Sequence, residues 1–244
     1  MLGAMNASHT ARQRARAELT REIKEAARRQ LAAVGAQQLS LRAVARELGM
    51  VSSAVYRYFP SRDDLLTALI IDAYDSIGEA ARRSDSRAGA VPRERWRAVC
   101  GALREWAVAN PHEYALVYGS PVPGYRAPMT TVEPAAKVPL TLLGIVHDAQ
   151  VRPARDSGPL PPELAGQAER LAREVGLDIP PPVMVRAMIA WTQLFGMLSF
   201  ELFGHLVGSA DPADAFFAHA VEQMAEFVGI PPAPAGGEPV AESI

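Results

Sequence analysis

Residues 39–66, LSLRAVARELGMVSSAVYRYFPSRDDLL, predict two short helices, a tight turn and the start of a third helix. Ser40 stands where a helix N-cap belongs, because its hydroxyl can accept a hydrogen bond from a first-turn amide. Apolar residues then recur at helical spacing over residues 41–48. Gly49 follows directly, and glycine most easily takes the left-handed conformation that ends a helix.

A second short helix is predicted to begin near Ser52. Val55 and Phe59 are expected to face inward, and Pro60 ends the helix. Ser61 followed by Asp64 resembles a capping box for the next helix. Helix, glycine turn and helix form a helix-turn-helix, whose second helix enters the major groove of DNA.

The same stretch resembles the DNA-binding domain of the TetR (tetracycline-repressor-like) family of transcriptional regulators. The resemblance is carried by residues 48–52 (LGMVS), 55–59 (VYRYF) and 61–66 (SRDDLL). It covers the N-terminal quarter closely and is mostly architectural beyond Arg83. It implies an all-α protein, in which a three-helix DNA-binding domain precedes a helical domain for ligand binding and dimerisation.

Composition agrees with an all-α protein of one large or two small domains. The chain has 244 residues, and β-branched residues rarely alternate with polar ones. Its single cysteine, Cys100, cannot form an intramolecular disulfide, and the N-terminus lacks the apolar core of a signal peptide. The apolar span 183–207 contains Arg186 and Glu201, which favours a buried helix over a membrane span. A cytoplasmic protein is therefore expected.

The two parts of the chain differ in charge. Residues 1–64 contain 11 Lys or Arg and 6 Asp or Glu, a net charge of +5, whereas the other 180 residues carry −7. A basic head attached to an acidic body is typical of a domain that contacts phosphates. The alternative is that these are ordinary solvated helix faces.

The predicted organisation has four parts. Residues 1–10 are expected to be a disordered leader, and residues 11–83 a DNA-binding domain that ends in a linking helix over 62–83. A polar loop over 84–91 is the expected domain boundary. Residues 92–229 form the body, and residues 230–244 are expected to be a disordered tail rich in Pro, Ala and Gly.

The body is predicted to consist of helices. Their ranges are 92–110, 112–118, 132–151, 163–175, 183–207 and 211–228. The helix over 183–207 is apolar nearly all round and must be covered on more than one side. Pairing the last two helices with their copies would form a four-helix interface of a homodimer, and a wholly intramolecular core is the alternative. Trp191, Gly196 and their neighbours resemble a C-terminal subtype with a Trp-His-Gly signature, in which Phe195 occupies the usual histidine position.

A set of polar and small residues is expected to contact DNA. The hydroxyls of Ser52 and Ser53 can bond to base edges, and the methyl of Ala54 can contact a thymine methyl. The resemblance implies tyrosine contacts with phosphates, although either tyrosine could instead close the small core beside Phe59. The predicted DNA-binding set is Ser40, Arg42, Ser52, Ser53, Ala54, Tyr56, Arg57, Tyr58 and Arg62.

A second set could line an effector cavity in the body, where TetR-like regulators bind ligands. A mostly apolar lining favours a small hydrophobic or aromatic molecule, but most such residues at helical spacing are ordinary core. The set is Trp106, Tyr114, Tyr118, His147, Met184, Met188, Trp191, Phe195 and Phe200.

No catalytic, metal or cofactor site is predicted. The five histidines, His9, His112, His147, His205 and His219, lack metal-ligand spacing. The chain also lacks a glycine-rich phosphate loop and a nucleophile elbow. The expected protein is a homodimeric repressor that a small hydrophobic effector releases from a palindromic operator. The alternatives are an activator or ligand-independent DNA-binding protein and, in another class, a helical enzyme or carrier.

Overall fold

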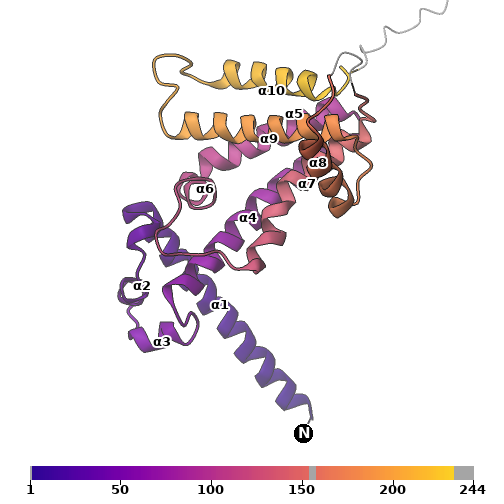
Figure 1. The fold of residues 1–244 in the computed structure, drawn as a ribbon. Helices are drawn as coiled ribbons and strands as arrows, with labels where there is room; N and C mark the ends of the chain where they lie inside the picture. The colour runs from indigo at the N-terminus through magenta and orange to yellow at the C-terminus, as the bar shows by residue number, and fades with distance from the viewer. Residues whose placement is uncertain (1, 154–157, 234–244) are drawn as a thin grey trace, which may run out of the picture. The chain divides into compact units, whose positions relative to one another are not determined.

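The computed structural model describes residues 2–153 and 158–233, and every regular element in these ranges is a helix (Figure 1). The all-α prediction is therefore confirmed. The α-helices are α1 (Leu2–Val34), α2 (Leu41–Glu47), α3 (Ser52–Tyr56), α4 (Arg62–Arg87), α5 (Pro92–Ala109), α6 (Pro111–Tyr118), α7 (Val132–Asp148), α8 (Pro162–Val175), α9 (Pro181–Leu202) and α10 (Asp214–Val228). Two short 3-10 helices cover Ala36–Gln38 and Met129–Thr131.

The chain forms two compact units, which we call the head and the body. The head comprises Met1–Asp75 and Asn110–Ala135, and the body comprises Ser76–Ala109 and Ala136–Ile244. The division falls inside α4, not in the loop 84–91 where the sequence predicted it. Residues 110–135 join the head because their polar groups bond to it. Tyr74 donates its hydroxyl to the carbonyl of Val117 at 3.3 Å, and the hydroxyls of Thr67 and Tyr125 lie 2.9 Å apart.

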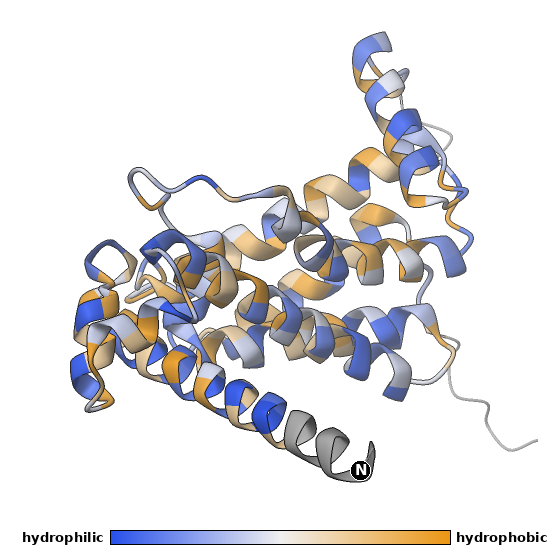
Figure 2. Cartoon of the chain, turned by 90° about the horizontal axis from the view of Figure 1, so that it is seen from below, coloured by the Kyte–Doolittle hydropathy of each residue, from blue (hydrophilic) through white to orange (hydrophobic). Residues whose placement is uncertain are grey.

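The head has a small apolar core. It contains Ile23, Ala26, Ala27 and Leu31 from α1, together with Leu39, Leu41, Val44, Ala45, Val55, Phe59, Leu65, Leu66 and Leu69. Along α1, hydrophilic and hydrophobic residues alternate (Figure 2), as expected for a helix that buries one face. The apolar periodicity of residues 39–66 is thus satisfied by packing onto α1.

Both ends of the chain differ from the sequence prediction. The helix expected from Ala11 begins at Leu2, within the segment predicted to be a disordered leader. At the other end, Ile230 is only 2% exposed, its amide donates to Ala225 and its carbonyl accepts from Arg93. The ordered chain therefore extends past the predicted start of the tail, and residues 234–244 lie outside the described residues.

The linking helix α4 runs to Arg87, four residues beyond its predicted end. The added turn is held by α5, because Ser84 donates its hydroxyl to Ala98 at 2.8 Å and Asp85 pairs with Arg95 at 2.6 Å. These partners lie on another helix, so the polar composition of residues 84–87 alone suggested a loop.

Three body helices are shorter than predicted. The helix α7 ends at Asp148, before the predicted 151, and α10 begins at Asp214, after Pro212, instead of at 211. The helix α9 ends at Leu202, not 207, because Gly204 adopts a left-handed φ of 80°. There the amide of His205 donates to Phe200 at 2.8 Å, which closes a Schellman motif.

In the body, α5, α9 and α10 surround a core with a buried arginine beside it. Arg93 is 3% exposed and donates to the Glu222 carboxylate at 3.0 Å and to the Ile230 carbonyl at 2.9 Å. Trp96 donates its indole N–H to the Val221 carbonyl at 3.2 Å. A buried charge is tolerated only when such partners surround it.

Glu222 gives a pH-dependent test of this anchoring. Its hydrogen bond from Arg97, and next the interactions with Arg93, hold its pKa below the ordinary 4.5 against the opposing effect of partial burial. Because the folded-state pKa is depressed, the charged carboxylate stabilises the fold above the unfolded pKa, and this stability is lost as the pH falls through the lowered value. We expect Glu222→Gln to unfold at lower urea concentration than the parent at about pH 7, and the gap to be smaller at about pH 3, below the ordinary pKa.

Glu105→Gln is the matched control, because Glu105 is exposed on α5 and forms no ion pair with other described residues. It should leave urea unfolding unchanged at both pH values. A Glu222→Gln effect of equal size at both values would contradict the assignment.

Candidate nucleic-acid interface

The turn between α2 and α3 is a complete Schellman motif. Gly49 has a φ of 65°, which a residue with a side chain adopts only at a cost. Its amide donates to Arg46 at 3.2 Å, and the amide of Met50 donates to Ala45 at 2.8 Å. These bonds satisfy the last carbonyls of α2 and redirect the chain at once into α3.

The helix α3 and the residue after it expose part of the predicted DNA-binding set. Val55 is fully buried and Phe59 is 7% exposed, so these two residues attach α3 to the head core as predicted. Ser53, Tyr56 and Arg57 are exposed, whereas Ser52 and Ala54 are partly buried. We call residues 51–57 the reading edge.

The start of α4 is capped as predicted. The hydroxyl of Ser61 accepts from the amide of Asp64 at 3.1 Å and donates to its carboxylate at 2.7 Å. Ser40 differs from its prediction. It is the N-cap residue of α2, but its side chain makes no capping hydrogen bond, and its amide donates to the Gln30 side chain at 3.3 Å.

Arg62 is engaged within the head. Its guanidinium donates to three carbonyls of the α1–α2 connection, those of Ala36 (2.8 Å), Leu39 (3.2 Å) and Gln37 (3.2 Å). The sequence predicted a phosphate contact here. The structure shows a planar fork that ties the N-terminus of α4 to the segment before α2.

The two tyrosines predicted to contact DNA differ in environment. Tyr56 is 41% exposed. Tyr58 is partly buried against the head core, and the guanidinium of Arg16 lies 5.5 Å from its ring centroid. The ring of Tyr58 therefore packs against the small core, which was the alternative to a phosphate contact. Tyr56 stays exposed.

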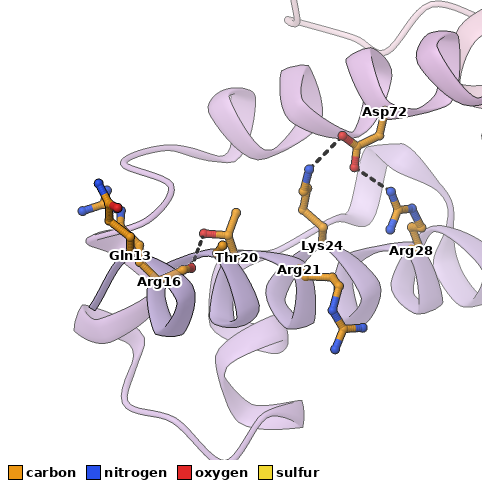
Figure 3. Close-up of a pocket in the computed structure, with 8 residues that line it drawn as sticks. Gln13, Arg16, Thr20, Arg21, Lys24, Arg28 and Asp72 are labelled. Atoms are coloured by element: carbon orange, nitrogen blue, oxygen red, sulfur yellow. Dashed lines mark hydrogen bonds and ion pairs between the residues drawn. The ribbon is translucent and has the colours of Figure 1, made fainter. Parts of the chain in front are cut away.

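Many basic residues of the head form ion pairs within it. A hollow of about 510 Å³ lies between α1 and α4 (Figure 3), and on it Asp72 accepts from Lys24 at 2.7 Å and Arg28 at 2.6 Å. Arg28 also donates to Glu113 of α6 at 2.8 Å. Arg21 points away from Asp72 in Figure 3 and pairs with Glu18 and Glu25. Much of the predicted basic character therefore stabilises α1 against α4 and α6.

Three other arginines lie around the helix-turn-helix. Arg42 and Arg46 are four residues apart on α2, so they share a face, and Arg57 follows α3. All three are exposed and form no ion pair with other described residues. Free guanidinium groups beside an exposed helix can bind phosphates. Arg46 was not predicted, although its spacing from Arg42 was a readable signal.

The predicted effector residues divide between the two units. Trp106, Met184 and Phe195 are buried in the body, and Trp106 donates to the Ser76 hydroxyl at 2.9 Å. Trp191 is partly buried, its ring lies 6.0 Å from that of Phe195, and its Nε1 is buried without a hydrogen-bond partner. In contrast, Met188 is 41% and Phe200 56% exposed.

Tyr114 and Tyr118 belong to the head, where their rings lie 5.2 Å apart and Tyr118 packs edge-on against Tyr74 at 6.0 Å. Burial raises the pKa of Tyr118 well above its usual range. These tyrosines pack inside the head, and so the structure does not group them with the body residues.

His147 lies at a small pocket of the body. The pocket has a volume of about 160 Å³, and its other lining residues include Gln150, Arg152 and Asp178. The His147 Nδ1 lies 3.4 Å from the Asp178 carbonyl. Sites for drug-sized ligands enclose roughly 300–1,000 Å³, so this pocket is too small for such an effector.

The groups able to perform chemistry are dispersed. Burial raises the pKa of the Cys100 thiol well above its usual range, which makes it a poor nucleophile. Within residues 2–153 and 158–233, no three His, Cys, Asp or Glu side chains are grouped to hold a metal ion.

The role of Arg62 is tested by Arg62→Lys, which keeps the positive charge but removes the planar guanidinium that reaches three carbonyls. Because three carbonyls lose their donor, the free energy of unfolding in urea should fall by about 1–3 kcal/mol. The exposed Arg42→Lys is the control and should unfold like the parent. An Arg62→Lys protein of unchanged stability and weakened DNA binding would instead support the phosphate contact.

Comparison with known proteins agrees with this geometry. Residues 23–69 match the family described as bacterial regulatory proteins, tetR family, and residues 96–224 match the tetracyclin repressor-like C-terminal domain. The HTH-type transcriptional regulator Rv1816 of Mycobacterium tuberculosis is 40% identical over 205 residues, which cover 79% of this chain and 84% of that protein.

Solved structures show the same fold. The crystal structure of SCO4313, described as a regulatory protein, aligns with a TM-score of 0.74 at 31% identity, over 88% of this chain and 98% of the other. A TetR family regulator from Marinobacter aquaeolei VT8 has a TM-score of 0.56 at 17% identity, over 88% and 97% of the two chains, and supports the fold alone. With both parts of the chain matched, the protein belongs to the TetR family of bacterial transcriptional regulators and is not an enzyme.

Proposed function

We propose that this regulator is a homodimeric repressor that leaves a palindromic operator when a small hydrophobic effector binds its body. The observation that carries the DNA part is the reading edge, an exposed face of α3 flanked by the unpaired Arg42, Arg46 and Arg57. Side chains of α3 would meet base edges, and the arginines would bind phosphates on either side.

The dimer is supported by exposed apolar residues on α9 and α10. On α9, Ile189 (46%), Phe200 (56%) and Phe203 (48%) follow helical spacing, and the exposed Gly196 lies on the same stripe with open space at its Cβ position. Phe216 and Phe227 are 45% and 43% exposed on α10, which runs antiparallel beside α9 (Figure 1). Clustered exposed aromatics favour a protein interface over solvent.

By length and composition α9 could also cross a membrane, and it is the one such helix in the described part of the chain. Its polar contacts favour packing in a water-soluble, cytoplasmic body. Glu201 of α9 pairs with Arg104 of α5 at 2.7 Å, and Arg104 also pairs with Asp214 of α10 at 2.9 Å. A second copy of the chain is the proposed cover for its exposed side.

The effector proposal rests on the buried face of α9. Met184, Phe195 and the ring of Trp191 offer an apolar surface, and the Trp191 Nε1 is a buried donor without a partner. A buried donor costs free energy until an acceptor reaches it. An effector with an aromatic or aliphatic frame and one hydrogen-bond acceptor would match this surface.

Release would follow from a population shift. Two heads must enter successive major grooves, about 34–36 Å apart. An effector that prefers a body conformation with another head spacing weakens DNA binding only by its difference in affinity for the two conformations. The helix α4 would carry the change because its residues belong to both units.

Operator binding is the first test. Genomic fragments bound by the protein, beginning with the region upstream of its own gene, would supply the operator. We expect Arg57→Ala to weaken operator binding while light scattering still shows a dimer. Because each dimer loses two phosphate contacts, the slope of log K against log salt should become shallower by about two.

Arg170→Ala is the matched control, since Arg170 is exposed on α8 of the body. It should leave both affinity and slope unchanged. Failure to bind any duplex DNA with a salt-dependent affinity would refute the DNA role and favour a helical carrier.

The effector is tested by screening small aromatic and aliphatic compounds for a thermal shift and for release of the operator. Trp191→Phe removes the unpartnered donor. It should lower the binding affinity of a compound that is active in both assays about fivefold or more. Without ligand we expect a small change in stability, since lost packing and relief of the unpaired N–H oppose each other.

The control is Trp96→Phe, because the indole N–H of Trp96 already donates to the Val221 carbonyl. It should lower stability without changing effector affinity. If thermal-shift compounds never release the operator, the protein is a ligand-independent DNA binder, and if they promote transcription it is an activator.

A further inference from the structure

Val51 is the residue of the reading edge whose exposure needs an explanation. Its side chain is 71% exposed, compared with 41% for Tyr56 and 45% for Val34 at the end of α1. It lies between Met50, which packs against the head core, and Ser52, which begins α3.

Helix stability does not account for this valine. Val51 is the N-cap residue of α3, with an extended backbone (φ −71°, ψ 138°) and no side-chain capping bond. Ser, Thr, Asp or Asn at this position would satisfy a first-turn amide, whereas valine leaves those amides to solvent or a ligand. At 71% exposure its packing contribution is also small.

Its place in the helix-turn-helix gives the methyl groups a different use. The N-terminal residues of the second helix meet base edges in the major groove. There, thymine presents a 5-methyl group, which apolar side chains contact. A β-branched side chain has few rotamers, so its methyl groups are already ordered before binding.

The neighbouring residues favour apolar readout at this point. Ser52 and Ala54 are small and partly buried, Arg46 lies on α2, and Arg57 lies beyond the end of α3. No long polar side chain at positions 51–54 competes for the same base edge. Desolvating the isopropyl group of Val51 against a thymine methyl would stabilise the complex.

We propose that Val51 determines part of the operator sequence by contacting the 5-methyl group of a thymine in each half-site. The proposal rests on the proposed operator binding and adds to it the chemical group that is read.

The test uses the selected operator in two forms of duplex. In one series, each thymine in turn is replaced by deoxyuridine, which keeps base pairing and lacks only the 5-methyl group. The parent protein should lose about fourfold in affinity at one thymine per half-site, the value expected for one buried methyl. The other thymines serve as internal controls.

Two variants separate readout from folding. Val51→Ala shortens the side chain, and Val51→Ser also restores a capping hydroxyl, so its urea midpoint should equal or exceed that of the parent. Both variants should have the same affinity for the operator with thymine and for the operator with deoxyuridine at the sensitive position. This double-mutant cycle isolates the methyl contact. Val34→Ala, an exposed valine of α1, should keep the fourfold difference.

The outcomes are distinct. Loss of discrimination in both Val51 variants, with retained folding and salt-dependent binding, supports the contact. Operator binding with equal affinity for all deoxyuridine duplexes, or Val51 variants that still discriminate, overturns it while leaving the proposed function intact. Absence of salt-dependent binding to any duplex is instead the failure of the proposed function.

Discussion

The left-handed turn at Gly49 is the constraint on which the DNA-facing part of the molecule depends. It ends α2, satisfies its last carbonyls through the amides of Gly49 and Met50, and sets the direction of α3. Val55 and Phe59 then attach α3 to the head core. Because these inner contacts fix the helix, the orientation of residues 51–57 is determined before any DNA is bound.

The charges of the head perform two separate tasks. Asp72 and Glu113 pair with Lys24 and Arg28, and Arg62 donates to three carbonyls. These contacts hold the helices together and leave fewer cations for phosphates than the net charge suggests. The free arginines of the helix-turn-helix are therefore more informative about DNA binding than the total charge of residues 1–64.

The body depends on α9, which carries a different environment on each side. One side buries Met184, Leu194 and Leu198, while the other exposes Ile189, Phe200 and Phe203. Clustered exposed apolar side chains of this kind favour a partner that covers them. The unpartnered Trp191 Nε1 and the exposed stripe thus belong to one element, which supports the proposal that ligand and partner act through the same helix.

The sequence alone determined the features that arise between residues close in the chain. The Gly49 turn, the Ser61–Asp64 cap, the inward Val55 and Phe59 and the all-α class all follow from local spacing and from the special conformations of Gly and Pro. The resemblance of residues 48–66 to the TetR family follows from the same segment. Helix ends were less predictable, because α4 is extended by contacts with α5 that no local pattern contains.

Only the tertiary structure decided which surfaces meet. It assigned Tyr114 and Tyr118 to the head. It made Arg62 a hydrogen-bond donor to carbonyls more than 20 residues away. It also left Val51 and Arg46 exposed beside α3. The physical reason is that a side chain's role depends on whether a distant group takes its hydrogen bonds or covers its apolar surface, and sequence spacing carries no information about such groups.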